Sequence, residues 1–277
     1  MKCQDHSHSN SSFWAKRYWI FCVLLLTCCN QIEFSPNQIS DRDSPTQLNE
    51  KNLAKLFSNP ADDTVTVVFV GDSQRWYDEM DRFVEKVNTL NAVDFVLLAG
   101  DISDFGLLQE FEWLNNRLRR LEKPYIGVIG NHDLVANGEE VFTRMFGPTD
   151  FSFVYDSIKF IAHNTNSMEY SRRKVPDMPW LSHALSDSKD AAYMITVSHV
   201  PPFSELEFDR ELAETYPLLL RQTPKMLLSL HGHVHQHMDF YPYEDGVRYM
   251  TSYAFNQNAF VLLKIVNGKV FKSIIHY

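Results

Sequence analysis

Cysteine is almost absent from this chain, and its positions restrict the chemistry that most of the chain can perform. All four cysteines fall within the first 29 of the 277 residues, at Cys3, Cys22, Cys28 and Cys29. The rest of the sequence therefore has no thiols to form disulfides or to bind a metal as thiolates. A metal site beyond residue 29 has to be built from oxygen and imidazole ligands.

Basic residues are outnumbered by acidic ones. The net charge of −9 at pH 7 argues against a nucleic-acid-binding protein, because such proteins usually present a basic surface. We therefore expect no nucleic-acid partner, although an anionic substrate is compatible with this charge if bound cations supply local positive charge. The composition, with 44% hydrophobic residues over 277 positions, allows one domain with a substantial core.

The N-terminal segment, residues 1–28, resembles a secretory signal peptide. Lys16 and Arg17 precede an apolar run over residues 18–27, which is shorter than the about 20 residues that a membrane-spanning helix needs. The sequence Leu-Thr-Cys-Cys that follows resembles the lipobox of bacterial lipoproteins, with Cys29, or alternatively Cys28, as the lipid-bearing residue. We expect an exported membrane lipoprotein of the bacterial cell envelope, facing the periplasm. The alternatives are an uncleaved signal anchor and a cleaved signal without lipid.

The next segment, residues 29–62, is polar and contains three Ser-Pro or Asn-Pro pairs. This composition predicts a tether that holds a folded domain away from the membrane, with a short helix near residues 48–57. The folded domain is expected to cover residues 63–277.

Five apolar runs of this domain end in polar residues that are typical metal ligands. The runs cover residues 65–70, 93–99, 125–129, 192–197 and 226–230, and their length and composition predict buried strands. The polar residues after them are Asp72 and Gln74, Asp101 and Asp104, Asn131 and His132, His199, and His233 and His235. Because ligands bind beyond the carboxyl ends of strands in open α/β sheets, we expect these side chains to meet at one edge.

The residue types in this set favour particular cations. Carboxylate, amide and imidazole ligands suit manganese, iron or zinc. A shared carboxylate can hold two divalent cations roughly 3.5–4 Å apart, where they stabilise the attacking and leaving oxygens of an in-line displacement. The sequence therefore predicts two divalent metal ions and the hydrolysis of a phosphoester.

In their order and spacing, these segments resemble the calcineurin-like metallophosphoesterase family over about residues 64–265. The usual family pattern is D-x-H, G-D-x-x-D, G-N-H-D/E, a lone His, and G-H-x-H. The resemblance implies an α/β fold, a four-layer α/β/β/α sandwich of two mixed sheets. It also implies that a metal-activated hydroxide attacks a small phosphorylated substrate, either a phosphomonoester or a phosphodiester.

The resemblance implies a role for each matched residue. The first metal would be bound by Asp72, Asp101 and His235, and the second by Asp101, Asn131, His199 and His233, with Asp101 bridging the two. His132 would be catalytic, stabilising charge on the phosphate or protonating the leaving oxygen, and Asp104 would orient its imidazole.

Gln74 departs from the family pattern, which has a histidine at this position. A glutamine oxygen is a neutral and weaker ligand, so we expect a first site that is retained but weaker and that favours manganese or iron over zinc. Alternatively, Gln74 only hydrogen-bonds a metal-bound water. A different class of protein also stays open, namely a lipid-anchored binding or scaffold protein with a degenerate site.

The remaining segments predict helices and further strands. Helical spacing indicates helices over residues 77–90 and 107–121, with weaker signals over 180–186 and 205–221. Strands are expected over residues 237–243, 247–253, 259–266 and 270–276, paired as hairpins. Three histidines outside the motifs, His163, His183 and His231, are expected to have structural or surface roles.

Overall fold

The computed structural model describes residues 35–58, 63–171, 174–187 and 190–277. The predicted signal peptide, both candidate lipidation sites and the first part of the predicted tether lie outside the described residues, so export and lipid anchoring stay predictions. Residues Asn37–Tyr277 form one compact unit. Within the described residues, no helix combines the length and apolar character needed to cross a membrane.

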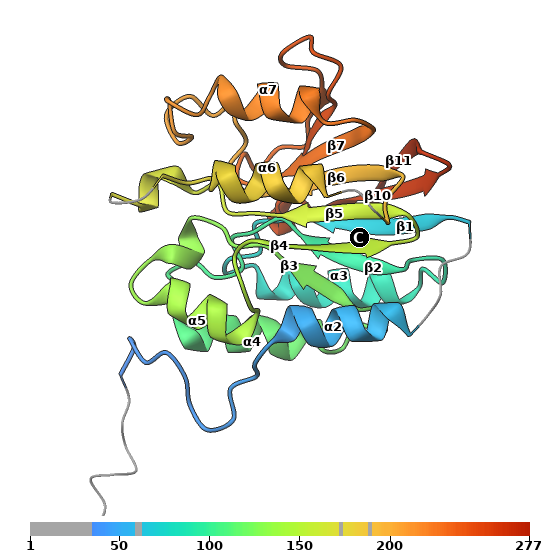
Figure 1. The fold of residues 1–277 in the computed structure, drawn as a ribbon. Helices are drawn as coiled ribbons and strands as arrows, with labels where there is room; N and C mark the ends of the chain where they lie inside the picture. The colour runs from blue at the N-terminus through green and yellow to red at the C-terminus, as the bar shows by residue number, and fades with distance from the viewer. Residues whose placement is uncertain (1–34, 59–62, 172–173, 188–189) are drawn as a thin grey trace, which may run out of the picture. The chain divides into compact units, whose positions relative to one another are not determined.

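Two mixed sheets form the centre of this unit (Figure 1). The first sheet has the strand order β11-β10-β1-β2-β3, with β11 at Lys269–His276, β10 at Ala259–Val266, β1 at Val65–Val70, β2 at Phe95–Leu98 and β3 at Tyr125–Gly127. The second has the order β4-β5-β6-β7-β9-β8, with β4 at Phe151–Tyr155, β5 at Ile158–Ala162, β6 at Tyr193–Val197, β7 at Met226–His231, β9 at Tyr249–Thr251 and β8 at Asp239–Phe240. Strands β1 to β3 are parallel, as are β5, β6, β7 and β9.

Alternate side chains of the central strands face two different cores. In β1, Val67 and Phe69 pack between the two sheets, whereas Val68 and Val70 pack against helices on the outer face. Every residue of β1 is buried, which explains why its sequence is a continuous apolar run rather than an alternating one. Aromatic rings fill the space between the sheets, where Phe95 meets Phe160 edge to face at 5.3 Å.

Helices cover the outer face of each sheet. Helices α3 (Tyr77–Asn88), α4 (Leu108–Leu118) and α5 (Gly138–Met145) pack on the first sheet, while α6 (Met178–Ser186) and α7 (Thr215–Gln222) pack on the second (Figure 1). The arrangement confirms the predicted α/β fold with helix, sheet, sheet and helix in successive layers.

Hairpins account for several of the later strands. Strands β10 and β11 pair antiparallel across Asn267 and Gly268, whose φ angles of 49° and 74° suit a two-residue hairpin turn. Strand β8 is shorter than the strand predicted over residues 237–243. The β4–β5 hairpin, which turns at Asp156 and Ser157, was not predicted from the sequence.

Helix α2 (Leu48–Phe57) has the position expected from the sequence and is packed against the domain. Its Asn49 side chain pairs with the backbone of Gly127 in edge strand β3, accepting from the amide and donating to the carbonyl at 2.9 Å each. Leu48 and Leu56 are buried. The packed part of the chain therefore begins before residue 63, where the predicted tether was expected to end.

The pairing between Asn49 and Gly127 predicts a stability effect. Asn49→Ala leaves a buried donor and a buried acceptor of Gly127 without partners, and should lower the free energy of unfolding by about 2–4 kcal/mol. Urea unfolding measures this loss. Lys51→Ala, an exposed change in the same helix, is the control and should stay within about 0.5 kcal/mol of the wild type. Equal stability of the two variants would contradict the role of Asn49.

Candidate metal centre

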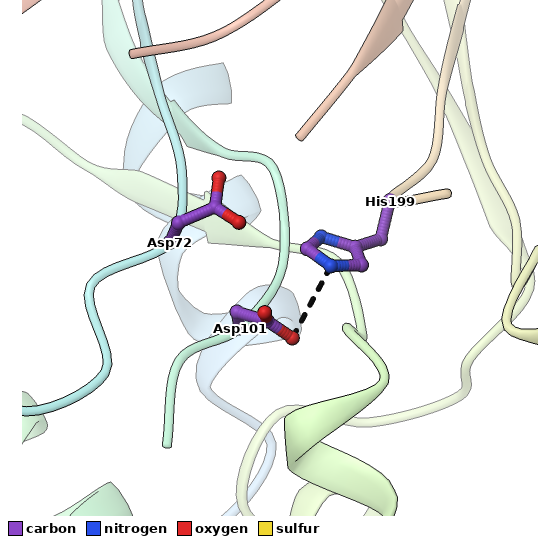
Figure 2. Close-up of side chains that lie close together, drawn as sticks. All are labelled: Asp72, Asp101 and His199. Atoms are coloured by element: carbon purple, nitrogen blue, oxygen red, sulfur yellow. Dashed lines mark ion pairs between the residues drawn. The ribbon is translucent and has the colours of Figure 1, made fainter. Parts of the chain in front are cut away.

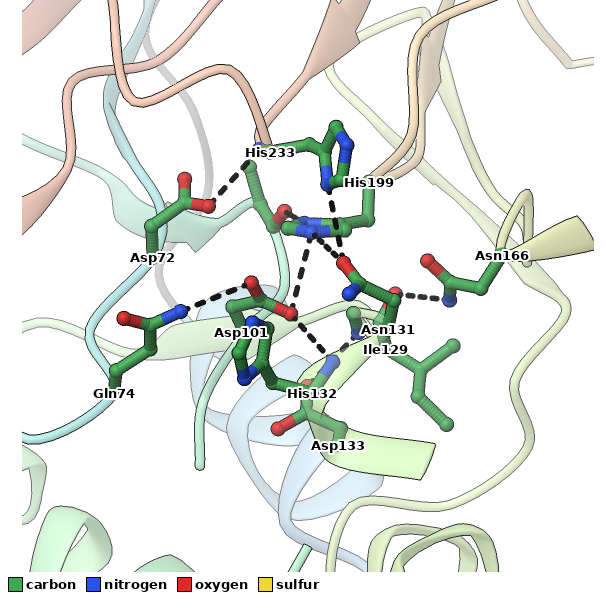
Figure 3. A network of polar contacts seen from close by, with 12 residues as sticks. Asp72, Gln74, Asp101, Ile129, Asn131, His132, Asp133, Asn166, His199 and His233 are labelled. Carbon is green, nitrogen blue, oxygen red and sulfur yellow. Dashed lines mark hydrogen bonds and ion pairs between the residues drawn. The ribbon is translucent and has the colours of Figure 1, made fainter. Parts of the chain in front are cut away.

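Five loops that follow the carboxyl ends of parallel strands converge where the two sheets lie side by side (Figure 3). Loops from the first sheet carry Asp72 and Gln74 after β1, Asp101 and Asp104 after β2, and Asn131 and His132 after β3. Loops from the second sheet carry His199 after β6 and both His233 and His235 after β7. The polar residues therefore meet at one common edge, as the strand-end pattern predicted.

Asp72, Asp101 and His199 form the buried centre of this group (Figure 2). Each offers one possible ligand atom, and these three atoms lie within 4.8 Å of one another. His199 Nε2 is 3.2 Å from Asp101 Oδ1, and Nδ1 donates to the carbonyl of Ala99 at 2.7 Å. Because Nδ1 is engaged with the main chain, Nε2 is the nitrogen that is directed at the cluster.

The charges of this centre depend on each other. Burial alone would raise the pKa of Asp101, but the neighbouring His199 and His132 lower that pKa to about 2. Burial also lowers the pKa of His199, whereas Asp101 and then Asp72 raise it to about 9. Binding a cation through Nε2 requires the loss of this imidazole proton, because metals bind the neutral ring.

The other predicted ligands surround the same three residues. Asn131 Oδ1 lies 3.0 Å from His199 Nε2 and 3.1 Å from His233 Nδ1. His235 Nε2 lies 3.2 Å from Asp72 Oδ1, and Gln74 Nε2 lies 3.3 Å from Asp101 Oδ2. These distances connect all seven residues predicted as metal ligands: Asp72, Gln74, Asp101, Asn131, His199, His233 and His235.

The backbone at this site is held in an unfavourable conformation. Five of the seven residues have positive φ angles: Asp72 at 55°, Gln74 at 38°, Asp101 at 52°, His233 at 70° and His235 at 54°. The left-handed region costs an L-residue roughly 1–2 kcal/mol, and such strain persists where the surrounding structure holds it and gathers at functional sites. The loop conformations therefore place the side chains in the cluster at a cost in backbone conformational energy.

Two glycines allow the loops to approach each other closely. A Cβ atom at Gly130 would lie 2.1 Å from the backbone nitrogen of Asp101, and one at Gly100 would lie 2.5 Å from His199 Nδ1. Both distances are too short for any side chain, so these motif glycines are needed for packing of the site.

Asp133, which was not among the predicted site residues, organises the site. Its buried carboxylate accepts hydrogen bonds from the amides of Ile102 at 3.1 Å, Ser103 at 2.7 Å and Gly130 at 2.8 Å, and from the Ser103 hydroxyl at 2.9 Å. Burial and the charge of Asp101 raise the pKa of Asp133 to about 7. Asp133 thus ties the loop after β2 to the loop after β3, and its position in the G-N-H-D motif was the available signal.

Asp72 shows that the site fits a cation. Its Oδ2 atom is buried and has no hydrogen-bond partner among the described residues, although Oδ1 accepts from the amide of His233 at 3.0 Å. A buried oxygen without a partner is unfavourable, and a bound cation would satisfy it. The carboxylate, amide and imidazole set around it is the donor chemistry of borderline divalent metals.

His132 lies at the exposed side of the cluster, next to the buried Asp104. The side chain of His132 is 39% exposed, and its amide donates to Asp101 Oδ1 at 3.0 Å. His132 Nδ1 is 2.9 Å from the main-chain carbonyl of Asp104, whereas the Asp104 carboxylate is 3.8 Å away and 3.5 Å from Arg75. The Asp104 atom nearest the imidazole is therefore the backbone oxygen, not the carboxylate expected from the motif.

The three histidines predicted to have structural or surface roles lie outside the cluster. His231 is buried, with its ring nitrogens 3.0 Å from the Ser198 hydroxyl and 2.8 Å from the Ser229 hydroxyl. His163 is buried with Nε2 3.0 Å from the Tyr216 hydroxyl, and His183 is exposed on α6. Their surroundings are those of structural and surface residues.

Residues 65–237 match the family model of calcineurin-like phosphoesterases. The chain therefore belongs to the calcineurin-like phosphoesterase family, as its motifs predicted.

Two curated relatives act on cyclic nucleotides according to their names. A probable cyclic nucleotide phosphodiesterase of Xenorhabdus bovienii is 32% identical over 66 residues, 23% of this chain and 27% of that protein. A 3′,5′-cyclic-nucleotide phosphodiesterase of Nostoc sp. is 26% identical over 167 residues, 58% of this chain and 62% of that protein. The chain thus spans less than two-thirds of the length of each of these relatives.

A solved structure supports the fold. A dimetal phosphatase from Danio rerio has a TM-score of 0.59 and 14% sequence identity, over 77% of this chain and 99% of that one. At this level of identity the likeness concerns the fold alone.

Proposed function

We propose that this protein hydrolyses a small phosphodiester with two divalent cations, and that a 3′,5′-cyclic nucleotide is the first substrate to test. The central observation is the position of Asp101 between two groups of ligands. Its Oδ1 atom faces His199 at 3.2 Å and its Oδ2 atom faces Gln74 at 3.3 Å. A carboxylate with an oxygen directed to each group is suited to bridge two cations.

The first group would consist of Asp72, Gln74 and His235, and the second of Asn131, His199 and His233, with Asp101 common to both. When bound, two divalent cations lower the pKa of a water molecule and neutralise charge on phosphoryl oxygens. The choice of a diester follows from the names of the two curated relatives, and a phosphomonoester is the alternative.

His132 is the residue suited to act on the substrate. It is part-exposed beside Asp101, while the carbonyl of Asp104 receives its Nδ1–H and so leaves Nε2 free to stabilise the phosphate or to protonate the leaving oxygen. Gln74 directs its amide nitrogen at Asp101 (Figure 3), and a half-turn of the amide would present its oxygen to a cation instead.

Metal removal tests the proposed function as a whole. The full-length protein should contain two divalent cations per chain by elemental analysis, lose its hydrolysis of 3′,5′-cyclic AMP and of an aryl diester after chelation, and regain it with manganese, iron or zinc. Activity on an aryl monoester alone would instead favour the phosphomonoester alternative. A protein that binds no cation, or hydrolyses equally well after chelation, would refute the proposal.

Variants of two carboxylates test the bridge. Asp101→Asn should lower the affinity for both cations, because both would share that carboxylate, whereas Asp72→Asn should weaken the first cation and spare the second. Identical metal contents for the two variants would contradict a bridging role for Asp101.

His132→Ala should lower kcat by roughly 10²–10⁴-fold, the usual contribution of a general acid or base, while leaving the metal content unchanged. Steady-state kinetics and elemental analysis of the same preparation measure both quantities. His183→Ala, on the exposed side of α6, is the matched control. A His132→Ala enzyme as active as this control would remove the assigned role.

Gln74→His should tighten binding of the first cation, because an imidazole is a stronger ligand than an amide oxygen. Gln74→Leu should weaken it, because leucine offers no ligand. Calorimetric titration of the metal-depleted protein with manganese gives both affinities. If neither change alters the first affinity, Gln74 contacts at most a water molecule at the site.

A further inference from the structure

An acidic side chain outside the family motifs touches the proposed metal centre. Glu207 lies in the loop between β6 and α7, and its Oε2 atom contacts Nε2 of His233. The two residues are 26 positions apart in the sequence. The contact therefore exists only because the loop folds back over the strand end that carries the G-H-x-H segment.

The imidazole of His233 has a distinct neighbour at each nitrogen. Nδ1 lies 3.1 Å from Asn131 Oδ1, inside the ligand cluster. Nε2 faces outward to Glu207. The ring is largely buried, with 14% of the side chain exposed, and the amide of His233 donates to Asp72 Oδ1 at 3.0 Å. Backbone and ring are thus held so that only Nδ1 can reach a cation shared with Asn131.

Glu207 is itself held in place by its own loop. The Ser204 hydroxyl donates to Glu207 Oε2 at 2.8 Å, and the Glu207 amide donates to the Ser204 carbonyl at 3.1 Å. The next residue, Phe208, is buried and packs edge to face on Tyr216 at 5.3 Å. An anchored neighbour and a local hydrogen-bonded turn fix where the carboxylate lies, although 49% of its side chain is exposed.

The charge of Glu207 suits this position. A glutamate side chain is ordinarily ionised at neutral pH, and the Glu207 carboxylate accepts from the Ser204 hydroxyl beside its contact with His233. A carboxylate accepts a hydrogen bond and donates none, so it selects the histidine tautomer that carries its proton on Nε2. In that tautomer Nδ1 has the free lone pair that a metal needs.

We propose that Glu207 is a positioning residue for His233, which holds the imidazole as the Nε2–H tautomer and thereby directs Nδ1 at the second cation. This inference rests on the proposed function, since it requires that His233 binds a metal. His199 has the equivalent arrangement with its nitrogens exchanged, because the main-chain carbonyl of Ala99 fixes Nδ1. The acceptor that fixes the ring is a side chain at His233 and a backbone carbonyl at His199. The partner of His233, Glu207, can therefore be changed by mutation.

Metal titration of matched variants tests the assignment. Glu207→Ala should weaken one of the two cation affinities by about 10-fold, the lower end of the range for outer partners of ligating histidines, and leave the other unchanged. Glu207→Gln keeps a hydrogen-bond acceptor without the charge, so its cation affinity should fall less than that of Glu207→Ala. Glu205→Gln, an exposed change in the same loop, is the control and should match the wild type, and all metal-depleted variants should have the same Tm.

Imidazole ¹⁵N NMR adds a readout that a purely structural role would not change. With cadmium-113 bound, the wild type should show Nε2 protonated and Nδ1 coupled to the metal at His233, and Glu207→Ala should show loss of this single tautomer. Unaltered affinities and an unaltered tautomer in Glu207→Ala would overturn the inference while the proposed function stands. A wild type that binds no cation would refute both together.

Discussion

The rest of the site depends on the contacts that the carboxylate of Asp101 makes. It accepts from the His132 amide, faces His199 from the second sheet and approaches Gln74 from the loop after β1. Loops from both sheets therefore meet on one buried side chain. Its own backbone is held by the tight approach of Gly130 and by the hydrogen bonds that Asp133 receives from the adjoining residues.

The two-sheet architecture explains how such distant residues converge. Parallel strands end at the same edge, and the aromatic core between the sheets fixes the two edges against each other. Histidines of the second sheet then supply imidazoles to a carboxylate of the first. Among the described residues, the α-helices contribute no side chain to this cluster, and their packing on the outer faces leaves the strand-end loops free for binding, as expected for α/β sheets.

The sequence predicted the parts of this structure that local pattern controls. Apolar runs located β1 and β10, and the order of the motifs predicted which polar side chains come together at the strand ends. The β4–β5 hairpin was missed because its turn, Asp156-Ser157, uses two positive φ angles without a glycine. Asp133 stands in the G-N-H-D motif, but its hydrogen bonds to the loop after β2 became visible only in the fold. Glu207 lies outside every motif, and its contact with His233 arises from tertiary structure alone. For Asp104, the motif named the residue, but only the fold showed that its backbone carbonyl lies nearest His132.

The left-handed backbone at the proposed ligands has a consequence for how this protein evolves. Glycine would adopt those φ angles freely, so at Gln74, His233 and His235 the residue best for the backbone conformation is one that offers a cation no ligand atom. Stability and chemistry therefore make opposite demands at the same positions. In a lineage that is no longer selected for catalysis, substitutions to glycine at these positions would accumulate and give a more stable protein without activity.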